Sequence, residues 1–183
     1  MTLENLGDLE KGKFFSRDGK SYVRYITAEH DYIHDGKLFF SKSFIEFNGG
    51  DEETQYFMFV TPDSDIDIHA RLNIAGGVEF EVYLLEGATT SANGTEVTTY
   101  NANRKSSTAP TVKAYAGPTV TGEGTNIWTV KLGSGKTSSG VGPSTNYEFI
   151  AKNNVKYVFK MIKKVANVSY LDFDFHWYEA SDD

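Results

Sequence analysis

The chain has 183 residues, a formal net charge of −7 and no cysteine. This length suits one domain with a substantial core, and the lack of thiols excludes disulfides, thiolate catalysis and cysteine-based zinc sites. The acidic balance argues against nucleic acid as the main partner. Neither a signal-peptide core nor a membrane-spanning run is present, so we expect no membrane partner and no secretion by the ordinary route.

The first segment, residues 1–33, has weak hydrophobic periodicity. Residues 2–6 suggest a fragment of helix and residues 22–26 a short strand. We interpret the segment as an N-terminal arm that lies on the domain or on a neighbouring subunit. The candidate residues for that contact are Leu3, Leu6, Phe14 and Phe15.

Residues 38–47 are dense in aromatic side chains and predict one or two strands, with a break near residues 41–43. Residues 48–51, Asn-Gly-Gly-Asp, have the composition of a turn. Residues 55–61 predict a strand in which Tyr56, Met58 and Val60 share one face and Phe57 and Phe59 the other. Because apolar residues occupy both faces, we expect both to be covered.

Residues 66–84 carry the clearest pattern in the chain. Apolar residues occupy the even positions from Ile66 to Ile74, resume at Val78 and continue to Leu84, with polar residues between most of them. This is the period of strands that bury one face. A three-residue loop around Gly76 would pair Ile74 with Val78, so the pattern predicts an antiparallel hairpin with one apolar face. A second sheet is needed to cover that face.

The composition changes over residues 87–144, which are rich in Gly, Ser, Thr and Asn and hold three of the four prolines. Short alternating pieces at 97–100, 111–115 and 127–132 favour hairpins with long loops over a disordered linker. Alternation then returns at 147–151, 155–161 and 171–177. The last of these predicts a strand in the middle of a sheet, beside a strand from early in the chain.

About ten short strands separated by turn residues, with no convincing helix, predict an all-β fold. We expect an antiparallel two-sheet β-sandwich of jelly-roll kind over residues 34–183.

Several motifs suggest sites, and each has a structural explanation that we favour. Residues 133–137 (GSGKT) end like a phosphate-binding loop, but Val130 stands where that loop needs a glycine and no helix follows. Residues 63–67 open like a calcium loop, yet Ile68 and Ile74 replace its required glycine and glutamate. We therefore predict a flexible loop at residues 133–137 and the solvent-exposed face of a strand at residues 63–67.

The four histidines, His30, His34, His69 and His176, are not paired at ligand intervals, which favours surface or turn roles over a metal site. No nucleophile elbow and no distinct carboxylate pair stand out. The sequence thus predicts no catalytic, cofactor-binding or metal-binding residues, and we expect a protein that is not an enzyme.

Four aromatic residues in or beside the glycine-rich region, Tyr100, Tyr115, Trp128 and Tyr147, could stack on sugars if they are exposed. We favour the alternative that Trp128 and its neighbours line the core of the second sheet. A carbohydrate-binding module, of a receptor-binding or adhesin kind in a tail or head fibre, stays open as the second function.

A series of short motifs between His34 and Glu179 carries information beyond hydrophobic alternation and composition. In chain order these are 34–39 (HDGKLF), 60–62 (VTP), 85–89 (LEGAT), 94–95 (GT), 100–107 (YNANRKSS), 118–120 (PTV), 124–125 (GT), 132–135 (LGSG), 152–157 (KNNVKY) and 177–179 (WYE). In this order and spacing the set resembles a family of virion structural proteins of tailed bacteriophages. It is most similar to the small proteins that decorate or cement the outer surface of the capsid.

The resemblance implies a non-enzymatic β-sandwich that is made in the host cytoplasm, binds the major capsid protein and stabilises the head. It also implies a homo-oligomer, a dimer or trimer, located on the capsid surface of the virion. The motif-like and locally basic loop with Asn101, Asn103, Arg104 and Lys105 is the candidate for an oligomer or capsid contact. An equally weighted alternative is structural, with these side chains bonding the backbone of a long connection.

Overall fold

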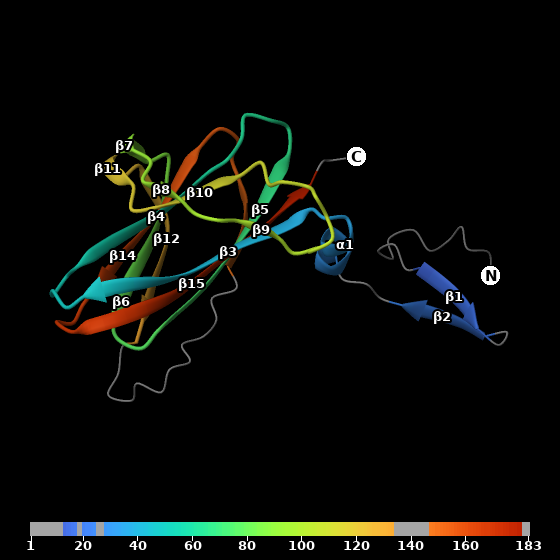
Figure 1. Ribbon diagram of the computed structural model, residues 1–183, viewed down its shortest axis with the longest axis horizontal. Coiled ribbons are helices and arrows are strands. Elements are labelled where there is room, and N and C mark those ends of the chain that lie inside the picture. The colour runs from blue at the N-terminus through green and yellow to red at the C-terminus, as the bar shows by residue number, and fades with distance from the viewer. Residues whose placement is uncertain (1–12, 18–19, 25–27, 134–146, 181–183) are drawn as a thin grey trace.

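The computed structural model describes residues 13–17, 20–24, 28–133 and 147–180, and Figure 1 shows the arrangement of its elements. The elements are almost all strands, with one short helix, so the predicted all-β class is confirmed. Within the described residues, no helix is both long and apolar enough to cross a membrane. The elements, in chain order, are β1 (Lys13–Arg17), β2 (Lys20–Arg24), α1 (Ala28–His34), β3 (Leu38–Asn48), β4 (Thr54–Val60), β5 (Asp67–Gly76), β6 (Phe80–Glu86), β7 (Thr89–Ala92), β8 (Thr95–Glu96), β9 (Tyr100–Asn101), β10 (Lys113–Ala116), β11 (Thr119–Gly122), β12 (Thr125–Leu132), β13 (Tyr147–Ala151), β14 (Lys156–Lys163) and β15 (Val168–Ala180).

Two antiparallel sheets face each other across the core. The five-stranded sheet has the order β13-β5-β15-β3-β9, and the six-stranded sheet has the order β12-β6-β14-β4-β10-β8. From β3 to β6 successive strands alternate between the sheets, and so do β13, β14 and β15. This winding is that of a jelly roll. The predicted position of the last strand is confirmed, because β15 lies between β5 and the early strand β3.

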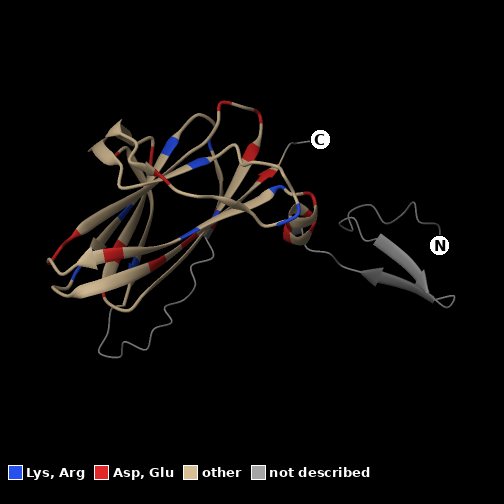
Figure 2. Ribbon diagram, in the orientation of Figure 1, with Lys and Arg blue, Asp and Glu red and all other residues tan. Residues whose placement is uncertain are grey.

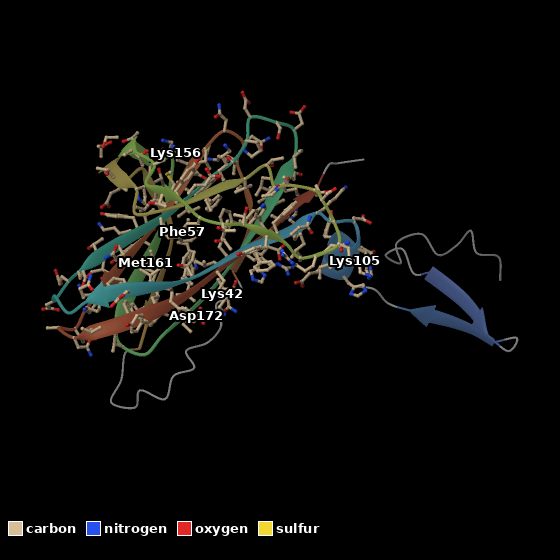
Figure 3. The ribbon with its side chains drawn as sticks, in the orientation of Figure 1. Lys42, Phe57, Lys105, Lys156, Met161 and Asp172 are labelled. Atoms are coloured by element: carbon tan, nitrogen blue, oxygen red, sulfur yellow. The ribbon has the colours of Figure 1, made fainter. Side chains whose placement is uncertain are left out.

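Aromatic rings from both sheets fill the space between them. Phe57 of β4 lies 4.6 Å from Phe173 of β15, measured between ring centroids, and Phe59 lies 4.6 Å from Phe175. Figure 3 labels Phe57 and Met161, two residues of this core. All of these side chains are fully buried, so the inward face of each sheet supplies one half of a shared core.

The predicted hairpin over residues 66–84 is wrong. The even-numbered residues of β5 are buried as expected, and so are Phe80, Val82 and Leu84 of β6, but the two strands lie in opposite sheets. The connection is an arch over the end of the core. A Cβ on Gly76 would lie 2.7 Å from the Phe80 ring, so only glycine allows the chain to turn this closely over that ring.

Strand β3 is continuous through Ser41, Lys42 and Ser43, so the predicted break is wrong. Ladder pairing with β15 runs along the whole strand and holds these small and charged residues extended. The prediction for β4 is confirmed, because Phe57 and Phe59 enter the main core and Met58 is fully buried on the other face. There Met58 packs in a second apolar cluster with Leu85, Ala88 and Val158.

The sequence patterns did not predict α1, the seven-residue helix before β3. Glycine terminates it: Gly36 has φ 69°, its N–H donates to the Ile33 carbonyl, and the Lys37 N–H donates to the Tyr32 carbonyl. This is the Schellman arrangement of a helix C-terminus. A Cβ on Gly36 would also lie 2.4 Å from the Ser106 hydroxyl oxygen, so this turn packs directly against the 101–107 loop.

Strands β1 and β2 pair with each other in a hairpin that joins neither sheet of the sandwich. Phe14 and Phe15 lie in β1, where they pair with Val23 and Tyr22. The other two predicted arm contacts, Leu3 and Leu6, fall outside the described residues, and so does the helix fragment expected at residues 2–6. A contact of this arm with a neighbouring subunit stays a prediction.

Candidate functional site

The outer face of the five-stranded sheet is the candidate binding surface. It exposes large apolar side chains: Phe44 of β3 is 67% exposed and Tyr170 of the adjacent β15 is 53% exposed. In the register of the two strands, Phe44 is paired with Asp172 and Tyr170 with Glu46, so rings and carboxylates alternate across the face. Lys42 Nζ lies 3.7 Å from an Asp172 carboxylate oxygen, and Figure 3 labels both on this side of the sandwich.

One edge of this face is also open. Strand β9 pairs only with Phe39 and Phe40, so among the described strands none covers the β3 edge from Ser41 to Asn48. An uncovered strand presents unpaired N–H and C=O groups to any extended chain that reaches it. The exposed rings therefore adjoin a backbone edge that can accept another strand.

A polar network joins α1 to the same face. Arg71 Nε donates to Glu148 at 2.6 Å, and its Nη1 donates to Glu29 of α1 at 2.9 Å. The Tyr178 hydroxyl donates to Glu148 at 2.8 Å, and its ring stacks on Tyr32 of α1 at 4.3 Å between centroids. An ion pair and a ring stack thus attach the helix to the sheet, and Glu148 bonds both of the sheet residues that make these contacts.

This network shifts the titration of its members. Burial alone would raise the pKa of Glu148, but the hydrogen bonds from Tyr178 and Arg71 lower that pKa on balance. Burial and the bond to Glu148 together raise the pKa of Tyr178. Burial opposes the charge of Arg71, yet hydrogen bonds to Glu148 and Glu29 raise the pKa of its guanidinium. The ion pair of Arg71 with Glu148 is therefore charged throughout the neutral range.

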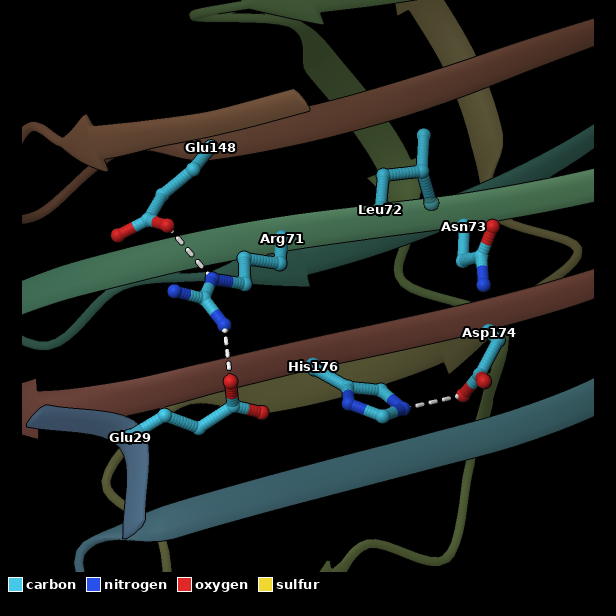
Figure 4. A pocket seen from close by; sticks show the side chains of 7 residues that line it. All are labelled: Glu29, Arg71, Leu72, Asn73, Glu148, Asp174 and His176. Atoms are coloured by element: carbon cyan, nitrogen blue, oxygen red, sulfur yellow. Dashed lines mark hydrogen bonds and ion pairs between the residues drawn. The ribbon is translucent and has the colours of Figure 1, made fainter. Parts of the chain in front are cut away.

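A depression of about 440 Å³ lies between α1 and the sheet (Figure 4). It is lined by Glu29, Arg71, Leu72, Asn73, Glu148, Asp174 and His176. Figure 4 shows the Arg71 guanidinium between Glu148 and Glu29, while the His176 Nε2 lies 2.7 Å from an Asp174 oxygen. The His176 ring in turn lies 5.9 Å from Phe40, which is 5.6 Å from Tyr100. Hydrogen-bonding groups and aromatic rings are thus contiguous here.

Among the described residues, acidic and basic positions are mixed along the ribbon of the sandwich (Figure 2). Acidic residues recur in α1, in the connection before β5 and on β3 and β15. This distribution favours a protein or sugar partner over a polyanion.

The residues predicted in the 101–107 loop divide into two pairs. Asn101 is only 8% exposed, and its amide nitrogen donates to the Gly36 carbonyl at 2.8 Å and the Thr108 carbonyl at 3.1 Å. Asn103 donates to the His34 carbonyl at 3.1 Å. The two asparagines therefore have the structural role of the alternative interpretation, because their side chains bond the backbone. Arg104 and Lys105 are exposed, and Arg104 lies 5.1 Å above the Tyr100 ring.

A buried carboxylate fixes the other end of this loop. Glu179 accepts hydrogen bonds from the Thr111 N–H at 2.8 Å and from the Trp177 indole N–H at 3.1 Å. Asn101 joins one end of the long connection to the turn after α1, and Glu179 joins the other end to β15, so the exposed basic side chains of the connection are presented on a fixed backbone.

The other predicted positions have structural explanations. Trp128 packs against the main core and Tyr115 against the second cluster, which supports the core interpretation over sugar stacking. Tyr100 remains 42% exposed. Residues 134–137 of the phosphate-like motif lie outside the described residues, as does the side chain of Tyr147. Nowhere in the described ranges do three His, Asp or Glu side chains gather as metal ligands do.

The sequence interpretation missed one juxtaposition. Because no helix was predicted at residues 28–34, the spacing of His30 and His34 carried no meaning, although positions i and i+4 share a helix face. The signals for the helix were present: Glu29 and Asp31 in its first turn and Gly36 just past its end. In the structure the two Nε2 atoms are 2.9 Å apart.

Comparisons of the chain with protein-family models, curated proteins and solved structures find no match.

Proposed function

We propose that this chain is a non-enzymatic structural protein of a tailed-bacteriophage virion that binds the outer capsid surface and stabilises the head. The support comes from the ordered motif series between His34 and Glu179 and from the open face of the five-stranded sheet. The partner is the major capsid protein, and the chain acts as a dimer or trimer made in the cytoplasm of the host.

The exposed rings beside an uncovered strand edge carry the proposal. Phe44 and Tyr170 supply apolar area that the fold does not need for its own core. The edge of β3 supplies backbone groups that can pair with a strand of a capsid subunit. Repetition over a symmetric shell multiplies such modest contacts, so each copy needs only weak affinity of its own.

The test is cosedimentation of the purified full chain with undecorated phage heads, followed by heating of the decorated particles. We expect saturable binding and greater resistance of the heads to heat. Replacing the two rings together, by Phe44→Ser and Tyr170→Ser, should reduce occupancy of the heads at least about tenfold, because central apolar contacts dominate interface energies.

Ile127→Ser is the matched control. Ile127 is also an exposed apolar residue, at 36%, but it lies on β12 of the other sheet. This variant should bind heads like the unaltered chain. Equal binding by the double ring variant would refute the proposed surface, and absence of any binding to heads would refute the function.

One observation favours a second candidate, a carbohydrate-binding module. The Phe40–Tyr100 ring pair borders the depression that Asn73, Asp174 and His176 line, and sugars bind where rings adjoin hydrogen-bonding groups. A glycan array distinguishes the two functions. Binding to a defined sugar that Tyr100→Ala abolishes would favour the second candidate.

A further inference from the structure

We propose that His30 and His34 of α1 form a binding site for a late first-row divalent transition-metal cation, Ni²⁺ or Cu²⁺. The two imidazoles lie one helical turn apart on the same face of the helix. Their ring centroids are 4.6 Å apart with an interplanar angle of 66°, and their Nε2 atoms are 2.9 Å apart. The two nitrogens are thus close enough to bind one ion.

The distance between the nitrogens matches a specific coordination angle. With metal–nitrogen bonds of about 2.05 Å, two ligands at a right angle stand about 2.9 Å apart, whereas a tetrahedral angle needs about 3.3 Å. Right-angle coordination by nitrogen is the preference of Cu²⁺ and Ni²⁺, which also rank high in affinity for imidazole. A cation of this class would keep this separation of the nitrogens, and each ring would turn its lone pair from the other nitrogen toward the ion.

The helix that carries the pair is held on its other side. Glu29 bonds Arg71 and Tyr32 stacks on Tyr178, while Asn103 donates to the His34 carbonyl. These contacts fix α1 against the sheet and leave the His34 ring exposed. A fixed backbone lowers the entropic cost of chelation, because both ligands are already placed.

The charges near the two histidines and the protonation of their rings are also compatible with the binding of a cation. Glu29 and Asp31 lie in the same helix, and Asp35 follows it. Without metal, one Nε2–H donates to the other Nε2. Binding requires a lone pair on both Nε2 atoms, so the donating ring moves its proton to Nδ1 while two waters leave the cation. No electron is transferred in this step.

The test is calorimetric titration of the full, untagged chain with NiCl₂ and, separately, with CuCl₂. We expect saturation at about one cation per chain. His34→Gln and His30→Gln should each weaken binding on the order of a hundredfold, because the second imidazole then no longer binds intramolecularly. His176→Gln, which alters a histidine outside α1, is the matched control and should bind like the unaltered chain.

A spectroscopic measurement separates this site from binding elsewhere. Electron paramagnetic resonance of the Cu²⁺ complex should show coupling to two nitrogens, reduced to one in His34→Gln. Circular dichroism verifies that each variant is folded. Equal affinity of the unaltered chain and His34→Gln, or a Cu²⁺ signal that this substitution leaves unchanged, would overturn the proposal.

Discussion

The two outer faces of the sandwich differ in what covers their outward side chains. On the six-stranded sheet, Met58, Leu85 and Val158 point outward but are buried, because Ala88 and Val120 in the neighbourhood of β7 and β11 pack over them. On the five-stranded sheet no described strand covers the outward side chains, and Phe44 and Tyr170 remain exposed. Figure 1 shows the β7–β11 ribbon beside the six-stranded sheet and α1 at one end of the other.

The difference shows where the fold leaves apolar surface for a partner. An apolar outward residue under a covering ribbon is part of the folded protein's own stability, whereas one without a cover contributes little to it. Substitutions on the two faces should therefore separate stability from binding.

The largest effect is expected on the covered face. Met58→Ser should lower the free energy of unfolding by about 3–5 kcal/mol, because it leaves a cavity and buries a hydroxyl that has no hydrogen-bond partner there. Urea denaturation measures the change. A loss below about 1 kcal/mol would mean that the β7–β11 ribbon does not seal this face.

Asn101→Ala tests the loop that borders the open face. Removing the amide leaves the Gly36 and Thr108 carbonyls without their donor, which should cost about 1–3 kcal/mol. Arg104→Ala in the same loop is the control and should change stability by less than about 0.5 kcal/mol. Similar losses for both variants would contradict the structural role of Asn101.

Glu148→Gln tests the attachment of α1 through the pH dependence of stability. The pKa of Glu148 is lowered in the folded protein, so its contribution is present above the ordinary carboxyl value of 4.5 and is lost as the pH falls below it. We expect the variant to lose less stability than the unaltered chain between neutral and acid pH. The effect should stay under about 1 kcal/mol, because solvent screens this partly exposed pair. If the stabilities of the two proteins changed in parallel with pH, the predicted contribution of Glu148 would be contradicted.

The smallest effect on stability is expected for Phe44→Ser. The side chain is mostly in water, so its loss should change the free energy of unfolding by no more than about 0.5 kcal/mol. The same substitution removes part of the proposed capsid contact. Urea denaturation gives the stability, and a loss comparable to that of Met58→Ser would show that the open face is also part of the core.

The sequence predicted which residues are buried better than which strands pair. Alternation identified the inward residues of β5, β6 and β15, because the burial of one face imposes a period of two on any strand. The same alternation fits a hairpin within one sheet and an arch between two sheets equally well. The contact of Gly76 with the Phe80 ring, which decides for the arch, depends on the whole fold and leaves no local pattern.

The candidate surface was harder to predict for a related reason. Exposure of Phe44 follows from the absence of a covering element among the described residues, and a single strand does not encode what its neighbours leave open. The His30–His34 pair was accessible in principle, since an acidic first turn and Gly36 mark a short helix. Local signals of this kind are lost when a segment of weak periodicity is read as irregular.

The central position of β15 has a consequence for biosynthesis. Among the described strands β15 is the last to be synthesised, and β3 and β5 both use it as a backbone partner. Until it emerges, those two earlier strands have unpaired edges and half of an aromatic interior in contact with water, a state prone to aggregation. The five-stranded sheet therefore cannot be completed before β15 has been synthesised.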